Sequence, residues 1–89
     1  MFDGELFDRF QTVIAKTLLV GNPNLITPES YLKKFFRGGK DGFVAQLDIR
    51  MALEEEFGID LEEEFCHISV ESDTAGRVFE CVERKMNGG

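Results

Sequence analysis

The two cysteines and the single histidine are the side chains of this sequence best suited to covalent or metal chemistry. Cys66 and His67 are adjacent, which suggests either a metal site or a nucleophile beside its base. Neighbours on a helix or turn point in different directions, and these residue types lack Cys-x-x-Cys spacing. We therefore interpret Cys66 and Cys81 as free thiols in a reducing compartment, with Cys81 beside an apolar helical stripe.

Two glycine-containing segments match ligand-binding loops only in part. Residues 38–40, Gly-Gly-Lys, lack the earlier glycine of a phosphate-binding loop and the Ser or Thr after its lysine. Residues 71–76 place a glycine at the sixth position of a calcium loop, but the first position is not Asp, and Val82 stands where a bidentate Glu is required. We therefore expect neither a phosphate loop nor a metal site, and no cofactor.

Carboxylates are concentrated in two runs, residues 54–56 and 62–64. An acid and base pair would need the pKa values of two carboxyl groups to be pushed apart, usually by burial in a cleft. A run of acids on a short domain is normally a solvated face. We assign no catalytic residue and do not expect an enzyme.

Composition indicates a small acidic protein. The 89 residues allow one domain with a thin core, and nine Phe with no Trp predict that Phe supplies most of its large side chains. A formal net charge of -7 disfavours nucleic acid and favours a basic protein surface as partner. Apolar runs are far shorter than the ~20 residues that span a bilayer. With no signal-peptide pattern in residues 1–5, we expect a cytoplasmic monomer without a membrane segment.

Apolar residues recur with helical periodicity in three segments. The first helix is expected over residues 6–17, with Asp3 as N-cap and an end by residues 21–23. The second helix is expected over residues 45–57 and ends at Gly58. The last helix is expected over residues 75–86, with Ser72 or Asp73 as its cap. Residues 25–42 form a long connection with one short helical piece, and residues 60–65 can hold one turn. The expected buried stripes are Leu6, Phe10, Val13, Ile14 and Thr17; Ala45, Ile49, Ala52, Leu53 and Phe57; and Ala75, Val78, Phe79, Val82 and Met86.

No run alternates over strand length, so these segments predict an all-α bundle. We expect one domain over residues 1–86, followed by a flexible tail over 87–89.

The second helix has a further face that its buried stripe does not explain. At 100° per residue, Leu47, Asp48, Met51, Glu54 and Glu55 lie roughly opposite the stripe. Two apolar side chains are therefore expected in solvent among acids. The alternative is that Leu47 and Met51 pack beneath the long connection.

Residues 51–59, Met-Ala-Leu-Glu-Glu-Glu-Phe-Gly-Ile, are similar to the second-helix signature of acyl carrier proteins. Residues 26–30, Ile-Thr-Pro-Glu-Ser, resemble the start of the long first loop of that family, and the order of helices agrees. The resemblance implies an acyl-carrier-type bundle of three long helices plus one short helix. It also implies that the second helix docks on basic patches of partner enzymes. The matching positions are Val44, Leu47 and Met51 for the apolar centre, and Asp48, Glu54 and Glu55 for the acids.

One departure from that family concerns its chemistry. Acyl carrier proteins carry phosphopantetheine on the serine of an Asp-Ser-Leu motif at the start of this helix. Here Phe43 stands at the serine position without a gap, or Gly42 if Asp41 is aligned with the motif aspartate, and no serine lies between Tyr31 and Ile68. A carrier-like protein that lost its arm, a chance resemblance in an unrelated helical protein, and an engineered change are the three explanations.

The sequence thus predicts an acyl carrier protein-like binding module, without a prosthetic-group serine, that docks on basic partner proteins through residues 44–55. One alternative is a divergent acyl carrier protein of fatty-acid or secondary-metabolite synthesis. The other is an unrelated small helical regulator.

Overall fold

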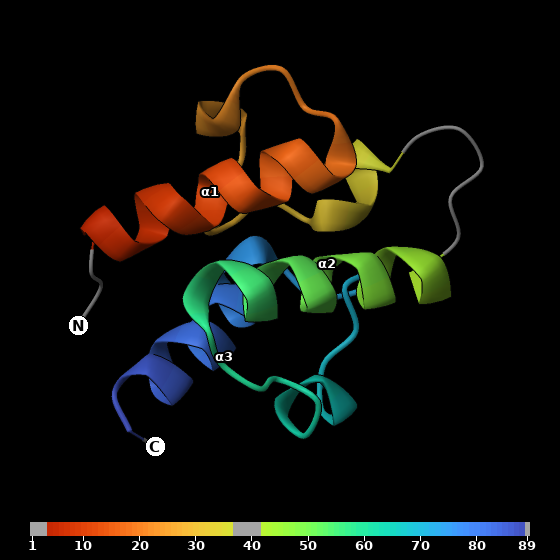
Figure 1. Ribbon diagram of the computed structural model, residues 1–89. Coiled ribbons are helices and arrows are strands. Elements are labelled where there is room, and N and C mark those ends of the chain that lie inside the picture. Colours follow the sequence, from red (N-terminus) through yellow and green to blue (C-terminus); the bar gives the residue numbers. More distant parts are fainter. Residues whose placement is uncertain (1–3, 37–41, 89) are drawn as a thin grey trace.

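The computed structural model describes residues 4–36 and 42–88, which form helices joined by turns and longer loops (Figure 1). The α-helices are α1 (Gly4–Leu18), α2 (Gly42–Phe57) and α3 (Ala75–Met86), and the 3-10 turns are η1 (Pro23–Leu25), η2 (Leu32–Phe35) and η3 (Glu64–Cys66). Within these ranges the β-structure consists of one isolated bridge, between Tyr31 and Thr74. The prediction of an all-α fold is therefore confirmed for the described residues.

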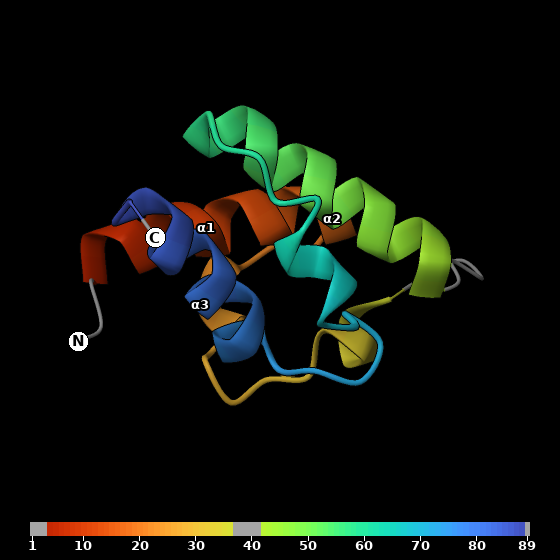
Figure 2. The ribbon, with the colours of Figure 1, turned by 90° about the horizontal axis from the view of Figure 1, so that it is seen from below.

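The helices α1 and α2 lie side by side and run in opposite directions, as both views show (Figures 1 and 2). Helix α3 packs beneath them, and its last turns lie at the end of the molecule where α1 begins. Segment 58–74 leaves the end of α2 and returns along the same helix, so that η3 lies beside it (Figure 2). This return places η3 next to the outer part of α2.

Phenylalanine rings join α1 to α3 in the core. Phe79 of α3 meets Phe7 edge-on at 5.1 Å between ring centroids and Phe10 at 5.3 Å, and the two α1 rings stack at 5.6 Å. Full burial of each ring contributes roughly 1.5–3 kcal/mol. Phe57 and Phe65 are also buried, whereas Phe43 is exposed. Five phenylalanines therefore supply large side chains to the core, together with leucines and isoleucines, and Phe43 lies outside it.

The buried face of α1 is turned slightly from the expected stripe. Phe10 and Ile14 are buried as predicted, but Leu6, Val13 and Thr17 are half-buried. The remaining buried residues of the helix are Phe7, Ala15 and Leu18. Leu6 and Val13 still pack against the core from its edge. The buried face is wider than the predicted stripe because α1 packs against both α2 and α3.

Helix α1 ends before residues 21–23, as predicted. Its last residue is Leu18, and Leu19 adopts a left-handed conformation (φ 59°). The Val20 N–H then donates to the Ala15 carbonyl at 2.8 Å, as in a Schellman-type end. Glycine normally occupies this left-handed position and marks the end of a helix in the sequence. Leu19 gives no such mark, so the exact last residue of α1 could not be predicted.

Helix α2 matches its prediction most closely. Ala45, Ile49, Leu53 and Phe57 are buried, while Ala52 is half-buried. The helix ends at Gly58 as expected. There φ is 64°, and the Gly58 N–H donates to the Glu54 carbonyl at 2.8 Å.

The cap of α3 is Thr74, and the expectation of Ser72 or Asp73 is wrong. The Thr74 side chain accepts from the Arg77 N–H at 3.4 Å. Asp73 is not available, because its carboxylate accepts from the Ser69 N–H at 2.8 Å and closes the preceding turn. At the other end of the helix, Met86 is exposed rather than part of the core.

The first long loop is fastened to the start of α3. The Ala75 N–H donates to the Ser30 carbonyl at 2.7 Å, and the Gly76 N–H donates to the Pro28 carbonyl at 2.9 Å. Ser30 is buried, and its hydroxyl accepts from the Thr27 N–H at 3.0 Å. Two helix N–H groups that have no partner inside α3 are thereby satisfied by the loop.

Some expectations fall on residues outside the described ranges. These are Asp3 as cap of α1, the glycine-lysine segment 38–40, and Asp41 as the motif aspartate. Within the described ranges, none of the helices is both long and apolar enough to cross a membrane.

Gly76→Ala should destabilise the fold. A Cβ at this position would lie 2.8 Å from the Pro28 carbonyl oxygen, a backbone atom that can shift only with the loop. We expect the free energy of unfolding, measured by urea denaturation, to fall by about 1–3 kcal/mol. Gly21→Ala is the matched control, because nothing lies within 4 Å of a Cβ there. Equal stability of the two variants would contradict this contact.

Candidate partner-binding site

The outer face of α2 carries a row of apolar side chains. Val44, Leu47 and Met51 follow one another at intervals of three and four residues, which places them on one side of the helix. Their exposed fractions are 43%, 39% and 56%, and that of Phe43 in the first turn is 81%. We call these four residues the apolar ridge. Leu47 and Met51 are thus exposed, as expected, and are not buried beneath the described part of the connection before α2.

Such a ridge has an energetic meaning. Single exposed apolar side chains are normal on a protein surface, but a contiguous set marks an interaction site more often. Apolar area removed from water contributes roughly 25 cal/mol per Å². Covering the ridge with another surface is therefore favourable in free energy.

Acidic residues lie on the flank of the ridge that faces α1. Asp48 is half-buried and Glu55 is exposed, and their separation of seven residues puts them on the same side of α2. Glu55 lines a groove of about 570 Å³ between α2 and α1, together with Thr12 and Lys16. The structure therefore brings these two predicted acids together beside the ridge.

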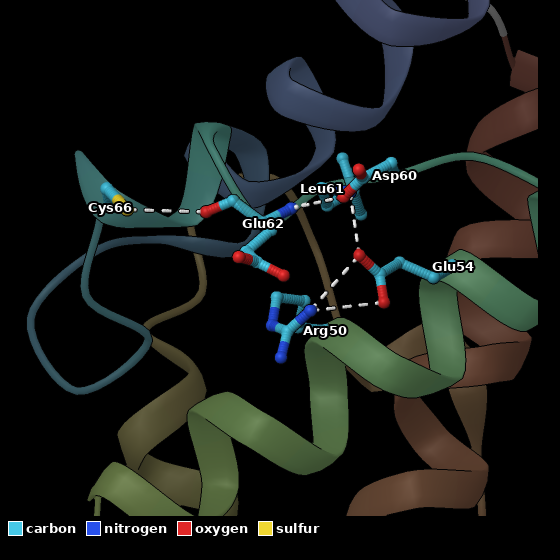
Figure 3. A network of polar contacts seen from close by, with 6 residues as sticks. All are labelled: Arg50, Glu54, Asp60, Leu61, Glu62 and Cys66. Carbon is cyan, nitrogen blue, oxygen red and sulfur yellow. Dashed lines mark hydrogen bonds and ion pairs between the residues drawn. The ribbon is translucent and has the colours of Figure 1, made fainter.

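Glu54, the third predicted acid, is engaged within the chain (Figure 3). Both of its carboxylate oxygens lie 3.2 Å from the Arg50 guanidinium, and one also accepts from the Leu61 N–H at 2.8 Å. This side chain is largely buried, with 21% of its surface exposed. Its carboxylate therefore fixes the loop that leaves α2, a role that helical spacing does not reveal.

A second groove, which we call the η3 groove, opens on the other flank of the ridge. It has a volume of about 470 Å³ and lies between α2 and the segment around η3. Its lining consists of Gly42, Phe43, Gln46, Leu47, Arg50, Glu62, Phe65, Cys66, Ser69 and Glu71. Phe43 and Leu47 belong to both the ridge and the groove, so the two apolar surfaces are continuous.

Gln46 holds the far wall of the η3 groove in place. Its amide nitrogen donates to the Phe65 carbonyl at 3.1 Å and to the Ile68 carbonyl at 3.2 Å, and its carbonyl oxygen accepts from the Val70 N–H at 3.2 Å. One side chain thus satisfies three backbone groups of the returning segment. Sequence reasoning missed Gln46, because its partners lie about twenty residues away and form no local pattern.

Both candidate positions of the missing serine lie in the first turn of α2. A Cβ at Gly42 would collide with the carboxylate of Glu71, so any side chain there would displace that residue. Phe43 presents its ring to solvent. Of the serines in the chain, Ser30 is buried in the first loop, Ser69 lines the η3 groove, and Ser72 is exposed.

The two thiols occupy different environments. Both are free; Cys66 is exposed at the η3 groove, and Cys81 is buried in α3. The Cys66 thiol donates to the Glu62 carbonyl at 3.4 Å. Burial raises the pKa of the Cys81 thiol, which keeps it protonated and slow to react. Over the described part of the chain, no three His, Cys, Asp or Glu residues gather as metal ligands.

Comparison with protein-family models, with curated proteins and with solved structures finds no match for this chain. The apolar ridge, its acidic flank and the η3 groove are therefore interpreted from their own geometry. The resemblance of residues 51–59 to acyl carrier proteins stays a prediction.

Glu54 and Glu55 should differ in their effect on stability, although they are adjacent acids. Glu54→Ala removes a charged hydrogen bond to the Leu61 N–H and the Arg50 pair, so we expect the free energy of unfolding to fall by about 1–2 kcal/mol. Glu55→Ala, on the exposed side of the helix, should change it by less than about 0.5 kcal/mol. Urea denaturation of both variants measures this difference. Equal losses would show that Glu54 does not position the loop.

Proposed function

We propose that this chain is an acyl carrier protein-like binding module that docks on a basic partner protein through the apolar ridge and its acidic flank. It works by binding and not by catalysis. The observation that carries the proposal is the exposure of Phe43, Val44, Leu47 and Met51 on one face of a helix whose opposite face contributes four buried residues to the core.

The apolar and the acidic side chains contribute to docking in different ways. The ridge supplies affinity when it is covered, and Met51 adapts to surfaces of different shape because its side chain is unbranched and flexible. Asp48 and Glu55 attract lysine and arginine and so steer the encounter. Glu54 takes no part, since its carboxylate is held by Arg50 and the Leu61 N–H.

Charge favours another protein over a second copy of this chain. Two copies meeting through their ridges would bring the Asp48 and Glu55 flanks near one another, with a net charge of -7 on each chain. Like charges at an interface oppose binding, whereas a basic surface gains from the same contacts. We therefore propose a monomer that binds a basic protein of the cytoplasm.

The acyl-carrier part of the proposal rests on the resemblance of residues 51–59 and on the order of the helices. In this interpretation Phe43 occupies the outward position where the family carries its serine, and an apolar contact replaces a covalent arm. The bundle type, with η3 as the short helix, belongs to the same proposal. Partners of this kind include enzymes of fatty-acid or polyketide synthesis.

Reversal of the acidic flank should abolish binding of basic partners. With the chain immobilised, we expect proteins captured from a cell extract by the native sequence to be lost by Asp48→Lys with Glu55→Lys, because attraction becomes repulsion. Glu5→Lys with Glu80→Lys is the control, since it changes the net charge equally at exposed residues of α1 and α3. Circular dichroism confirms that both variants fold. Capture that survives reversal of the flank contradicts the docking surface, and equal loss of capture in the control shows a general effect of net charge instead.

Loading with a prosthetic group separates this proposal from a divergent acyl carrier protein that keeps its arm. We expect no gain in mass when the chain is incubated with coenzyme A and a phosphopantetheinyl transferase, because the first turn of α2 offers Gly42 and Phe43 instead of a serine. Intact-protein mass spectrometry measures the result, with an ordinary acyl carrier protein as positive control. A gain of one arm on any residue would overturn the armless interpretation.

A further inference from the structure

The η3 groove indicates what kind of partner segment covers the ridge. We propose that the docking segment is a basic amphipathic helix, which packs on the apolar ridge and inserts one large apolar side chain into the η3 groove. This inference rests on the proposed function and adds to it the chemistry of the partner.

Continuity of the apolar surface is the first argument. Phe43 and Leu47 line the groove and are also part of the ridge, while the buried Phe65 lines the groove from the η3 side. A segment lying on the ridge therefore passes directly over the opening. A bulky side chain on that segment can enter the groove while the rest of the segment stays in contact with Leu47 and Met51.

Charge at the opening is the second argument. Glu62 and Glu71 line the groove and are exposed, whereas the cation of the lining, Arg50, is held by both oxygens of Glu54 at 3.2 Å. In Figure 3 the Glu62 carboxylate also points toward Arg50. With Asp48 and Glu55 on the opposite flank, carboxylates border the apolar surface on both sides. An occupant with lysine or arginine on both edges of an apolar stripe matches this pattern.

The spacing of the ridge favours a helix as occupant. Met51 lies seven residues after Val44, or about 10 Å along the axis of α2, with Leu47 between them. Rows of side chains at three- and four-residue intervals are the surfaces on which helices pack against one another. An extended peptide that adds as a β-strand would need a sheet edge, and the described residues hold no strand.

The groove on the other flank is a poorer receptor for an apolar side chain. Between α1 and α2 the lining includes Asp8, Arg9, Lys16, Glu55 and Glu56. Arg9 is paired with Glu56 at 3.3 Å and lies 4.6 Å from the centre of the Phe57 ring. An apolar side chain inserted there would remove charged groups from water. The η3 groove is lined by fewer charged side chains. Its wall is also fixed by Gln46, so less ordering is needed on binding.

Model peptides test the inference with the native chain. The probe is a synthetic helical peptide with leucine on one face and lysine on the other, and the comparison peptide carries glutamate in place of lysine. Fluorescence anisotropy gives Kd for each. We expect the leucine-lysine peptide to bind and the leucine-glutamate peptide not to bind.

Cys66 reports whether the groove is filled, because it is exposed at the lining while Cys81 is buried. With the leucine-lysine peptide at about ten times its Kd, alkylation of Cys66 by iodoacetamide should slow about tenfold, since mainly the free chain reacts. Peptide mapping by mass spectrometry follows Cys66 and Cys81 separately. The slow alkylation of Cys81 should not change.

Charge reversal at the opening provides the matched variants. Glu62→Lys with Glu71→Lys should raise the Kd of the leucine-lysine peptide about tenfold, because two attractions become repulsions. Glu5→Lys with Glu80→Lys, with the same change in net charge, should raise it much less. Equal effects of the two double variants would show a general charge effect and overturn the assignment of the groove.

The remaining outcomes separate this inference from the proposed function. A peptide that binds but leaves Cys66 unprotected overturns insertion into the groove, while docking on the ridge stands. Equal binding of both peptides overturns the basic character of the occupant. If neither peptide binds, the helical occupant is wrong, and the capture experiment with the reversed acidic flank still decides the proposed function.

Discussion

Three hydrogen bonds between the Gln46 side chain and the backbone of segment 65–70 determine which surfaces of α2 are covered. A half-buried amide at such a contact is stable only when its partners are present, and here two carbonyls and one N–H satisfy it. The segment is thereby held on one flank of the helix, where it forms the η3 groove. Lys85 of α3 adds an ion pair with Glu64 at 3.5 Å from the other side. The apolar ridge next to this flank remains in solvent.

The helices could be predicted because their signals are local. Ala45, Ile49, Leu53 and Phe57 repeat at helical intervals, and Gly58 provides the left-handed residue that ends α2. The end of α1 and the cap of α3 could not be predicted in the same way. Leu19 adopts a conformation that leucine normally avoids, and Thr74 becomes the cap because Asp73 is already bonded to the Ser69 N–H. Both depend on contacts that periodicity does not contain.

The same distinction holds for the candidate site. Exposure of Leu47 and Met51 follows from the angle between two faces of one helix, so the sequence predicts it. The roles of Glu54 and Gln46 depend instead on where segment 58–74 returns, which is set by tertiary packing. A helical projection therefore places Glu54 with Asp48 and Glu55, although the structure uses it to hold a loop. The η3 groove, built from residues distant in sequence, had no signal that could have been found.

Chemical-shift mapping tests the docking surface most directly. The ¹⁵N-labelled chain is titrated with a purified basic partner obtained by capture, and amide shifts are followed along the sequence. Docking through the ridge predicts that the largest changes fall on residues 43–55 and on η3, with small changes on the outward residues of α1 and α3. Largest changes on α1 or α3, with residues 43–51 unaffected, would contradict the assignment of the apolar ridge as the binding surface.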